Sequence, residues 1–187
     1  QLLPSIIVTA HLALALTLVA LMSAVSQSLL QENHAPSPIW WRLMGLSSLF
    51  LVVSQCLIGG RMATTWSSHR CFNLLGGCEL FDLHRFFAIP VACFVLLFVV
   101  VSLLAGGWTR SQWPLFSLVV ALLSMQIALG VASVHLNLSE PFVTIAHQLV
   151  AAILVALLAA LSFRRPDRSI FKTSQSVNQS LLETCHG

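Results

Sequence analysis

The sequence predicts an all-α integral membrane protein with about five transmembrane helices. Hydrophobic residues make up 57% of the 187 positions and charged residues only 8%, against roughly 25% charged residues in an ordinary soluble domain. The apolar residues fall in blocks of about 20, the length that crosses ~30 Å of hydrocarbon at 1.5 Å per residue. Lipid offers no partner for an unpaired backbone group, and the blocks lack the alternation of barrel strands. Each block is therefore predicted to be a helix.

Short polar or glycine-containing connections separate the predicted spans. A polar, proline-containing segment (31–38) follows the first span, and Gly106 and Gly107 break the third span from the fourth. Segment 139–141, which ends in a proline, separates the fourth from the fifth. From Arg164 onward the chain turns polar, which predicts a tail without a packed core. The predicted spans are residues 6–29, 43–64, 83–105, 113–136 and 142–163.

The distribution of basic residues predicts the orientation, because cytoplasmic loops near span ends carry an excess of Lys and Arg. Four basic residues between positions 164 and 172 crowd the exit of the fifth span. The C-terminus is therefore expected in the cytoplasm and the N-terminus outside. The net charge of +3 reflects this topology, and no basic stripe interleaved with aromatic residues suggests a nucleic-acid partner. The predicted divisions are residues 1–42 (first span and cytoplasmic loop), 43–165 (a four-helix half) and 166–187 (a polar cytoplasmic tail).

Two cysteines lie in the connection between the second and third spans, which is outside in this topology. Cys71 and Cys78 are seven positions apart, with a double glycine between them. An extracytoplasmic compartment permits a disulfide there. Two free thiols, or redox or metal chemistry, are the alternatives for this pair. Cys56 and Cys93 lie inside spans and are expected to pack as small hydrophobic residues.

A weak internal repeat is the strongest functional signal. The second and fourth spans each contain a glutamine followed four positions later by a glycine. An outer connection comes after each span, and then a helix with a histidine near its outer end, His84 or His147. The residues around His11 (8–12) are similar to those around His147 (143–148). The glutamine–glycine pairs are Gln55 with Gly59 and Gln126 with Gly130.

A histidine inside hydrocarbon is costly, so a functional role is its default interpretation. Neutral imidazole is a good iron ligand, and two rings from different helices could hold a haem inside a bundle. We therefore interpret His84 and His147 as haem ligands; the alternative is that each only hydrogen-bonds a neighbouring helix. Arg85 could place its guanidinium beside a haem propionate, or could simply reach the membrane surface. Gln55 and Gln126 are expected to bond helix to helix, with the paired glycines allowing close approach.

Taken together, these motifs resemble the haem A synthase family. Any one motif is weak, but their order and spacing are specific, and the likeness covers nearly all of the chain up to about Arg165. The outer loop looks most like that of cyanobacterial members. The motifs are Val8 to Leu12, Gln55 to Gly60, Cys71 through Cys78, Asp82 to Arg85, Gln126 to Gly130 and Ala146 to Ala151.

The resemblance implies a fold and a reaction. The family has eight helices in two pseudo-symmetric four-helix halves, and it oxidises a methyl group of haem O to the formyl group of haem A for cytochrome oxidase. A b-type haem (haem B) would lie between His84 and His147, and a disulfide would join Cys71 to Cys78. His11 matches one of the two histidines at the substrate haem. The chain then corresponds to the fourth to eighth helices of the family.

The expected function is therefore that of a haem A synthase-like oxidoreductase, in which this chain carries the b-type haem half. Methyl oxidation is expected near His11, and electron delivery at the haem of His84 and His147. The expected partners are the substrate haem O, membrane lipid, and haem O synthase or cytochrome oxidase assembly factors. The expected location is a bacterial cell membrane, cyanobacterial plasma or thylakoid membranes included. The alternatives are an electron-transferring membrane b-type cytochrome and a membrane thiol–disulfide oxidoreductase that would use Cys71 and Cys78.

Overall fold

Five long helices dominate the computed structural model, which describes residues 4–31, 35–64, 78–136 and 140–167. The described residues contain no strand, and all five helices are long and apolar enough to cross a membrane. The expectation of an all-α membrane protein with about five spans is confirmed, and each predicted end lies within four residues of a helix end. The helices are α1 (Ser5–Leu30), α2 (Ile39–Thr64), α4 (Glu79–Leu104), α6 (Trp113–His135) and α7 (Pro141–Phe163).

A short helix that the sequence did not predict, α5 (Gly107–Ser111), joins α4 to α6. The glycine before it and its own first residue have φ angles of +75° at Gly106 and +54° at Gly107, a left-handed conformation that side chains disfavour. The Thr109 hydroxyl donates to the Gly106 carbonyl at 2.7 Å. The double glycine therefore ends α4 as predicted. A helix of five residues has too few positions to show a hydrophobic period, so α5 was missed.

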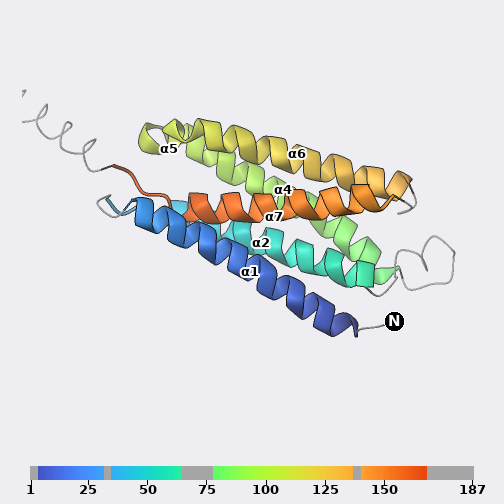
Figure 1. Ribbon diagram of the computed structural model, residues 1–187. Coiled ribbons are helices and arrows are strands. Elements are labelled where there is room, and N and C mark those ends of the chain that lie inside the picture. The colour runs from blue at the N-terminus through green and yellow to red at the C-terminus, as the bar shows by residue number, and fades with distance from the viewer. Residues whose placement is uncertain (1–3, 32–34, 65–77, 137–139, 168–187) are drawn as a thin grey trace, which may run out of the picture.

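Helices α2, α4, α6 and α7 form a four-helix bundle, with α1 packed outside it against α7 and α2 (Figure 1). Within the bundle, α2 packs along α4 and α7, and α6 packs along α7. The fourth pair, α4 and α6, makes far less contact. Figure 1 shows these two helices close together beside α5 and diverging toward their opposite ends. The bundle is thus closed at the α5 end and spread at the other.

The closed end is built around Trp41, whose side chain is fully buried. The indole Nε1–H donates to the backbone carbonyl of Leu161 at 2.8 Å, which ties α2 to α7. Ring centroids lie 5.2 Å away at Phe98, 4.9 Å at Trp108 and 5.7 Å at Phe116. One side chain of α2 therefore contacts α4, α5, α6 and α7, and such aromatic pairs add stability beyond their buried area.

Complete burial is largely confined to this half of the bundle. The core cluster runs from Trp41 to Val52 on α2 and from Val91 to Val99 on α4, with matching residues of α6 and α7. Toward the other end, every residue of α2 from position 53 to 60 is only half-buried. Cys56, on this stretch, packs against the core as expected, whereas the free Cys93 is exposed. The half of the bundle away from α5 is therefore loosely packed.

A glycine sets the distance between α2 and α7 near the closed end. A Cβ added at Gly45 would lie 2.6 Å from the Ser162 Oγ and 3.2 Å from the Ser162 Cα. The Ser162 hydroxyl is already bonded to the Leu158 carbonyl. Because the obstacle includes backbone, the helices would have to separate to admit a methyl group. At Gly60, the added Cβ would meet only the flexible end of Leu12.

We expect Gly45→Ala to destabilise the bundle by about 1–3 kcal/mol, the usual cost of overpacking. Thermal unfolding of the detergent-solubilised chain would measure the loss. Gly60→Ala is the matched control and should change the unfolding temperature much less, because Leu12 can move aside. Equal effects of the two substitutions would contradict this account of the α2–α7 contact.

Candidate functional site

The spread end of the bundle collects the residues of the internal repeat. Helices α4 and α7 begin at this end, whereas α2 and α6 finish there, and α1 also begins on this side (Figure 1). The histidines near the starts of α4 and α7 therefore lie at the same end as the glutamine–glycine pairs near the ends of α2 and α6. His11, near the start of α1, lies on the same side.

The first group joins α2 to α4. The Gln55 Nε2 donates to the His84 Nδ1 at 3.1 Å and to the His84 backbone carbonyl at 2.5 Å. A Cβ added at Gly59, one turn after Gln55, would lie 2.9 Å from the His84 Cε1. Glutamine thus holds the imidazole, and glycine leaves the room that the ring occupies.

The second group repeats this arrangement between α6 and α7. The Gln126 Nε2 lies 3.1 Å from the His147 Nε2, and a Cβ added at Gly130 would lie 3.3 Å from the His147 Cε1. The expected helix-to-helix role of Gln55 and Gln126 is therefore confirmed. The sequence did not predict that each glutamine would bind the histidine itself, although the repeated order of glutamine, glycine and histidine was the available signal.

Several polar atoms of these two groups are buried without a hydrogen-bond partner among the described residues. They are the Gln55 Oε1, the Gln126 Oε1 and the His147 Nδ1. Among the described residues, the His84 Nε2 also has no hydrogen-bond partner. A buried polar atom left unpaired costs roughly 1–3 kcal/mol, so the arrangement is not explained by stability alone. Two imidazoles on different helices, each with one uncommitted ring nitrogen, suit the axial ligation of a haem.

The remaining predicted site residues lie apart from these two groups or outside the described residues. The Arg85 guanidinium carbon lies 5.3 Å from the Phe81 ring centroid, and the Arg85 side chain is exposed. His11 is exposed on α1, whose Leu16 is buried in the core, so His11 does not join His84 and His147 in one site. Cys71 lies outside the described residues, and its disulfide with Cys78 stays a prediction.

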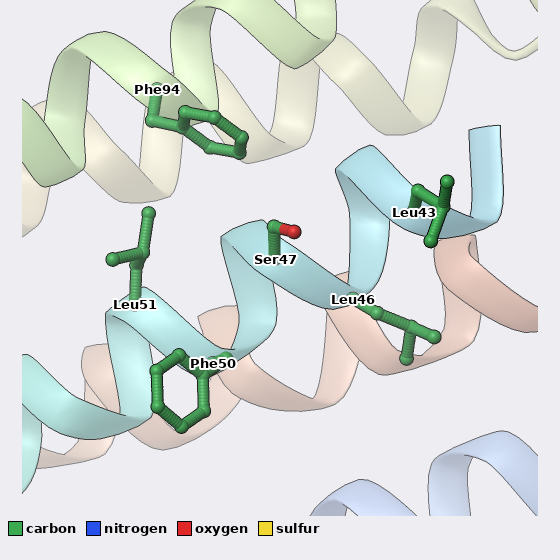
Figure 2. Close-up of a pocket in the computed structure, with 6 residues that line it drawn as sticks. All are labelled: Leu43, Leu46, Ser47, Phe50, Leu51 and Phe94. Atoms are coloured by element: carbon green, nitrogen blue, oxygen red, sulfur yellow. The ribbon is translucent and has the colours of Figure 1, made fainter. Parts of the chain in front are cut away.

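No cluster of three or more metal-binding side chains occurs in the described segments. This is compatible with haem, which needs only two axial ligands from the protein. An apolar groove of about 420 Å³ lies between α2 and α4, lined by five residues of α2 and by Phe94 (Figure 2). Phe94 is ten residues after His84, roughly 15 Å along the helix. Among the residues that line the groove, only Ser47 carries a hydroxyl, which offers no set of metal ligands. The groove is therefore separate from the histidine site.

Comparison with known proteins finds one family that the chain matches. The family model described as cytochrome oxidase assembly protein (COX15-CtaA) matches residues 2–159. The matched region includes α1, the whole of α2, α4 and α6, and both glutamine–glycine–histidine groups. No curated protein and no solved structure matches the chain.

We expect Gly59→Ala to displace the His84 imidazole, because the added methyl group would lie inside the contact distance of the ring. The neighbouring Gly60→Ala should leave the ring in place, since its methyl group meets Leu12. Nitrogen-15 NMR of histidine-labelled protein would report the change at His84. An unchanged His84 signal in Gly59→Ala would show that the ring is not held against α2.

Proposed function

Because the chain belongs to the haem A synthase family of cytochrome oxidase assembly proteins, we propose that its four-helix bundle holds a b-type haem between His84 and His147. The family itself acts in haem A synthesis for cytochrome oxidase. Within that process, the reaction we propose is oxidation of the haem O methyl group to the formyl group of haem A. The chain would contribute the haem-bearing half of this oxidoreductase.

One observation carries the proposal: the same three-residue unit occurs twice, on opposite pairs of helices. Each unit places an imidazole beside a glycine and binds one ring nitrogen to a glutamine amide, leaving the other nitrogen uncommitted. Helix packing alone does not explain why the buried His147 Nδ1 has no hydrogen-bond partner among the described residues. A flat macrocycle with two axial positions matches such a doubled site.

The loose packing around the two units supports the same conclusion. The stretch of α2 that carries Gln55 and Gly59 is only half-buried, and α4 and α6 diverge beside it (Figure 1). Side chains that face the interior of a membrane bundle without full contact lose dispersion energy. A large apolar ligand would restore those contacts. At the closed end, by contrast, Trp41, Phe98 and Phe116 are fully buried.

In this proposal, different residues of the chain would bind the iron, the substrate haem and a propionate. His84 and His147 would hold the iron, and the bound haem would supply the redox chemistry. A haem held by these two histidines would suit electron delivery. His11 would belong to a separate site for the substrate haem O, where the methyl group is oxidised. Arg85, exposed at the same end, would meet a propionate in place of the Phe81 ring.

The distribution of charge supports the proposed orientation in a bacterial membrane. Arg42, Arg110, Arg164 and Arg165 lie at the closed end, next to α5 and the start of α2. An excess of basic residues marks the cytoplasmic side. The histidines would then lie toward the outer surface, on the same side as the connection that contains Cys71 and Cys78. A disulfide is chemically permitted in that compartment.

An electron-transferring membrane cytochrome is the second candidate, because the doubled imidazole site would serve it equally well. Such a protein would bind haem B through the same two histidines. It would never convert haem O. The two candidates therefore differ in the substrate reaction and not in the spectrum of the b-type haem.

The first test is the absorption spectrum of the detergent-purified chain, oxidised and reduced with dithionite. We expect a low-spin b-type spectrum that is lost in both His84→Ala and His147→Ala, because each substitution removes an axial ligand. His135→Ala is the matched control, since His135 is exposed at the end of α6. A folded chain without bound haem, or unchanged spectra in both variants, would refute the proposed site.

The reaction itself is tested by extracting haems from membranes that contain haem O and this protein. We expect conversion to haem A to be lost in His11→Ala, while the low-spin b-type spectrum remains, because His11 is exposed on α1 and belongs to neither imidazole unit. Haem A that still forms at the normal rate in His11→Ala would remove His11 from the substrate site. A protein that never forms haem A would favour the electron-transfer candidate.

A further inference from the structure

In the haem-free structure, Gln55 and Gln126 each hold an imidazole through the amide nitrogen. We propose that they are positioning residues for the two histidines, and that each amide reverses its hydrogen bond when iron occupies the free ring nitrogen. The inference rests on the proposed haem site. The direction of two hydrogen bonds and three unpaired buried atoms support it.

The direction of each bond determines where the imidazole proton lies. A carboxamide nitrogen can only donate, so the ring nitrogen that faces it accepts and carries no proton. The Gln55 Nε2 faces the His84 Nδ1, and the Gln126 Nε2 faces the His147 Nε2. A neutral imidazole has one proton, which therefore lies on the other nitrogen, the His84 Nε2 or the His147 Nδ1.

Iron ligation requires the opposite distribution. The nitrogen that binds iron must be unprotonated, so the proton of a neutral ring moves to the nitrogen that faces the glutamine. That nitrogen then becomes a donor and needs an acceptor. The Gln55 Oε1 and the Gln126 Oε1 are acceptors that are buried and unpaired among the described residues. A half-turn of the carboxamide would present this oxygen to the ring N–H, and metal-bound histidines commonly donate to such an acceptor.

The two glutamines are not equivalent in this respect. The Gln55 Nε2 also donates to the His84 backbone carbonyl, so a half-turn would bring oxygen against oxygen and lose that bond. Among the described residues, Gln126 makes only the one bond to His147. Reversal is therefore less costly at Gln126 than at Gln55. Gln126 is also the cleaner position for a test, since its substitution leaves the α2–α4 contact unchanged.

The test compares Gln126→Leu and Gln126→Glu with Gln148→Leu. Gln148 adjoins His147 on α7 but is exposed, which makes it a matched control. We expect Gln126→Leu to weaken haem affinity on the order of 10- to 100-fold and to broaden the low-spin EPR signal. Gln126→Glu keeps an acceptor and should retain the haem, with a lower midpoint potential because a carboxylate makes the imidazole more basic. Gln148→Leu should match the wild type in all three properties.

Gln126→Leu with the affinity, EPR signal and midpoint potential of Gln148→Leu would overturn the inference and leave Gln126 as a helix-packing residue. Thermal unfolding of each variant separates a local effect from a misfolded chain, and retention of haem by Gln126→Glu gives a second check. A folded wild-type chain that binds no haem would instead refute the proposed function. Nitrogen-15 NMR of the haem-free chain would then test the hydrogen bonds directly. An unprotonated His147 Nε2 in the wild type would support the glutamine contact. A protonated His147 Nε2 would overturn it.

Discussion

The closed end of the bundle is assembled by the aromatic cluster around Trp41. Its indole ring contacts Phe98, Trp108 and Phe116, and its N–H binds the Leu161 carbonyl. These contacts hold α2, α4, α5, α6 and α7 together at one end of the bundle. Because α4 and α6 make little contact elsewhere, the helices can diverge toward the other end. A tight cluster at one end thus allows a loosely packed site at the other.

At the spread end, polar side chains take the place of the apolar core. A glutamine or histidine inside hydrocarbon is costly unless it finds a partner, and here each glutamine pairs with the histidine of the next long helix. The same contact connects the helices and orients the imidazole. The pairing is incomplete, since one amide oxygen in each unit has no partner among the described residues. Helix packing alone therefore does not satisfy these atoms.

Much of the fold could be predicted, whereas only part of the site could. The five spans followed from apolar length, and the double glycine at Gly106 and Gly107 marked the end of α4. The repeat of glutamine, glycine and histidine was visible, but its hydrogen bonds were not. The position of Arg85 over the Phe81 ring, and the separation of His11 from the other two span histidines, also came only from the structure. These features depend on how the helices rotate about their axes, which hydropathy does not report.

The amino-acid sequence was sufficient to predict the class of this protein, its spans and its candidate site residues. It did so because a bilayer imposes helix length and excludes unpaired polar groups, and both requirements act on each segment separately. The pairing of each glutamine with its histidine, the ring nitrogen that is held, and the closure of the bundle at Trp41 required the folded structure. Those outcomes come from packing between segments that are up to 120 residues apart in the chain, where side-chain shape and hydrogen-bond direction select one arrangement among many.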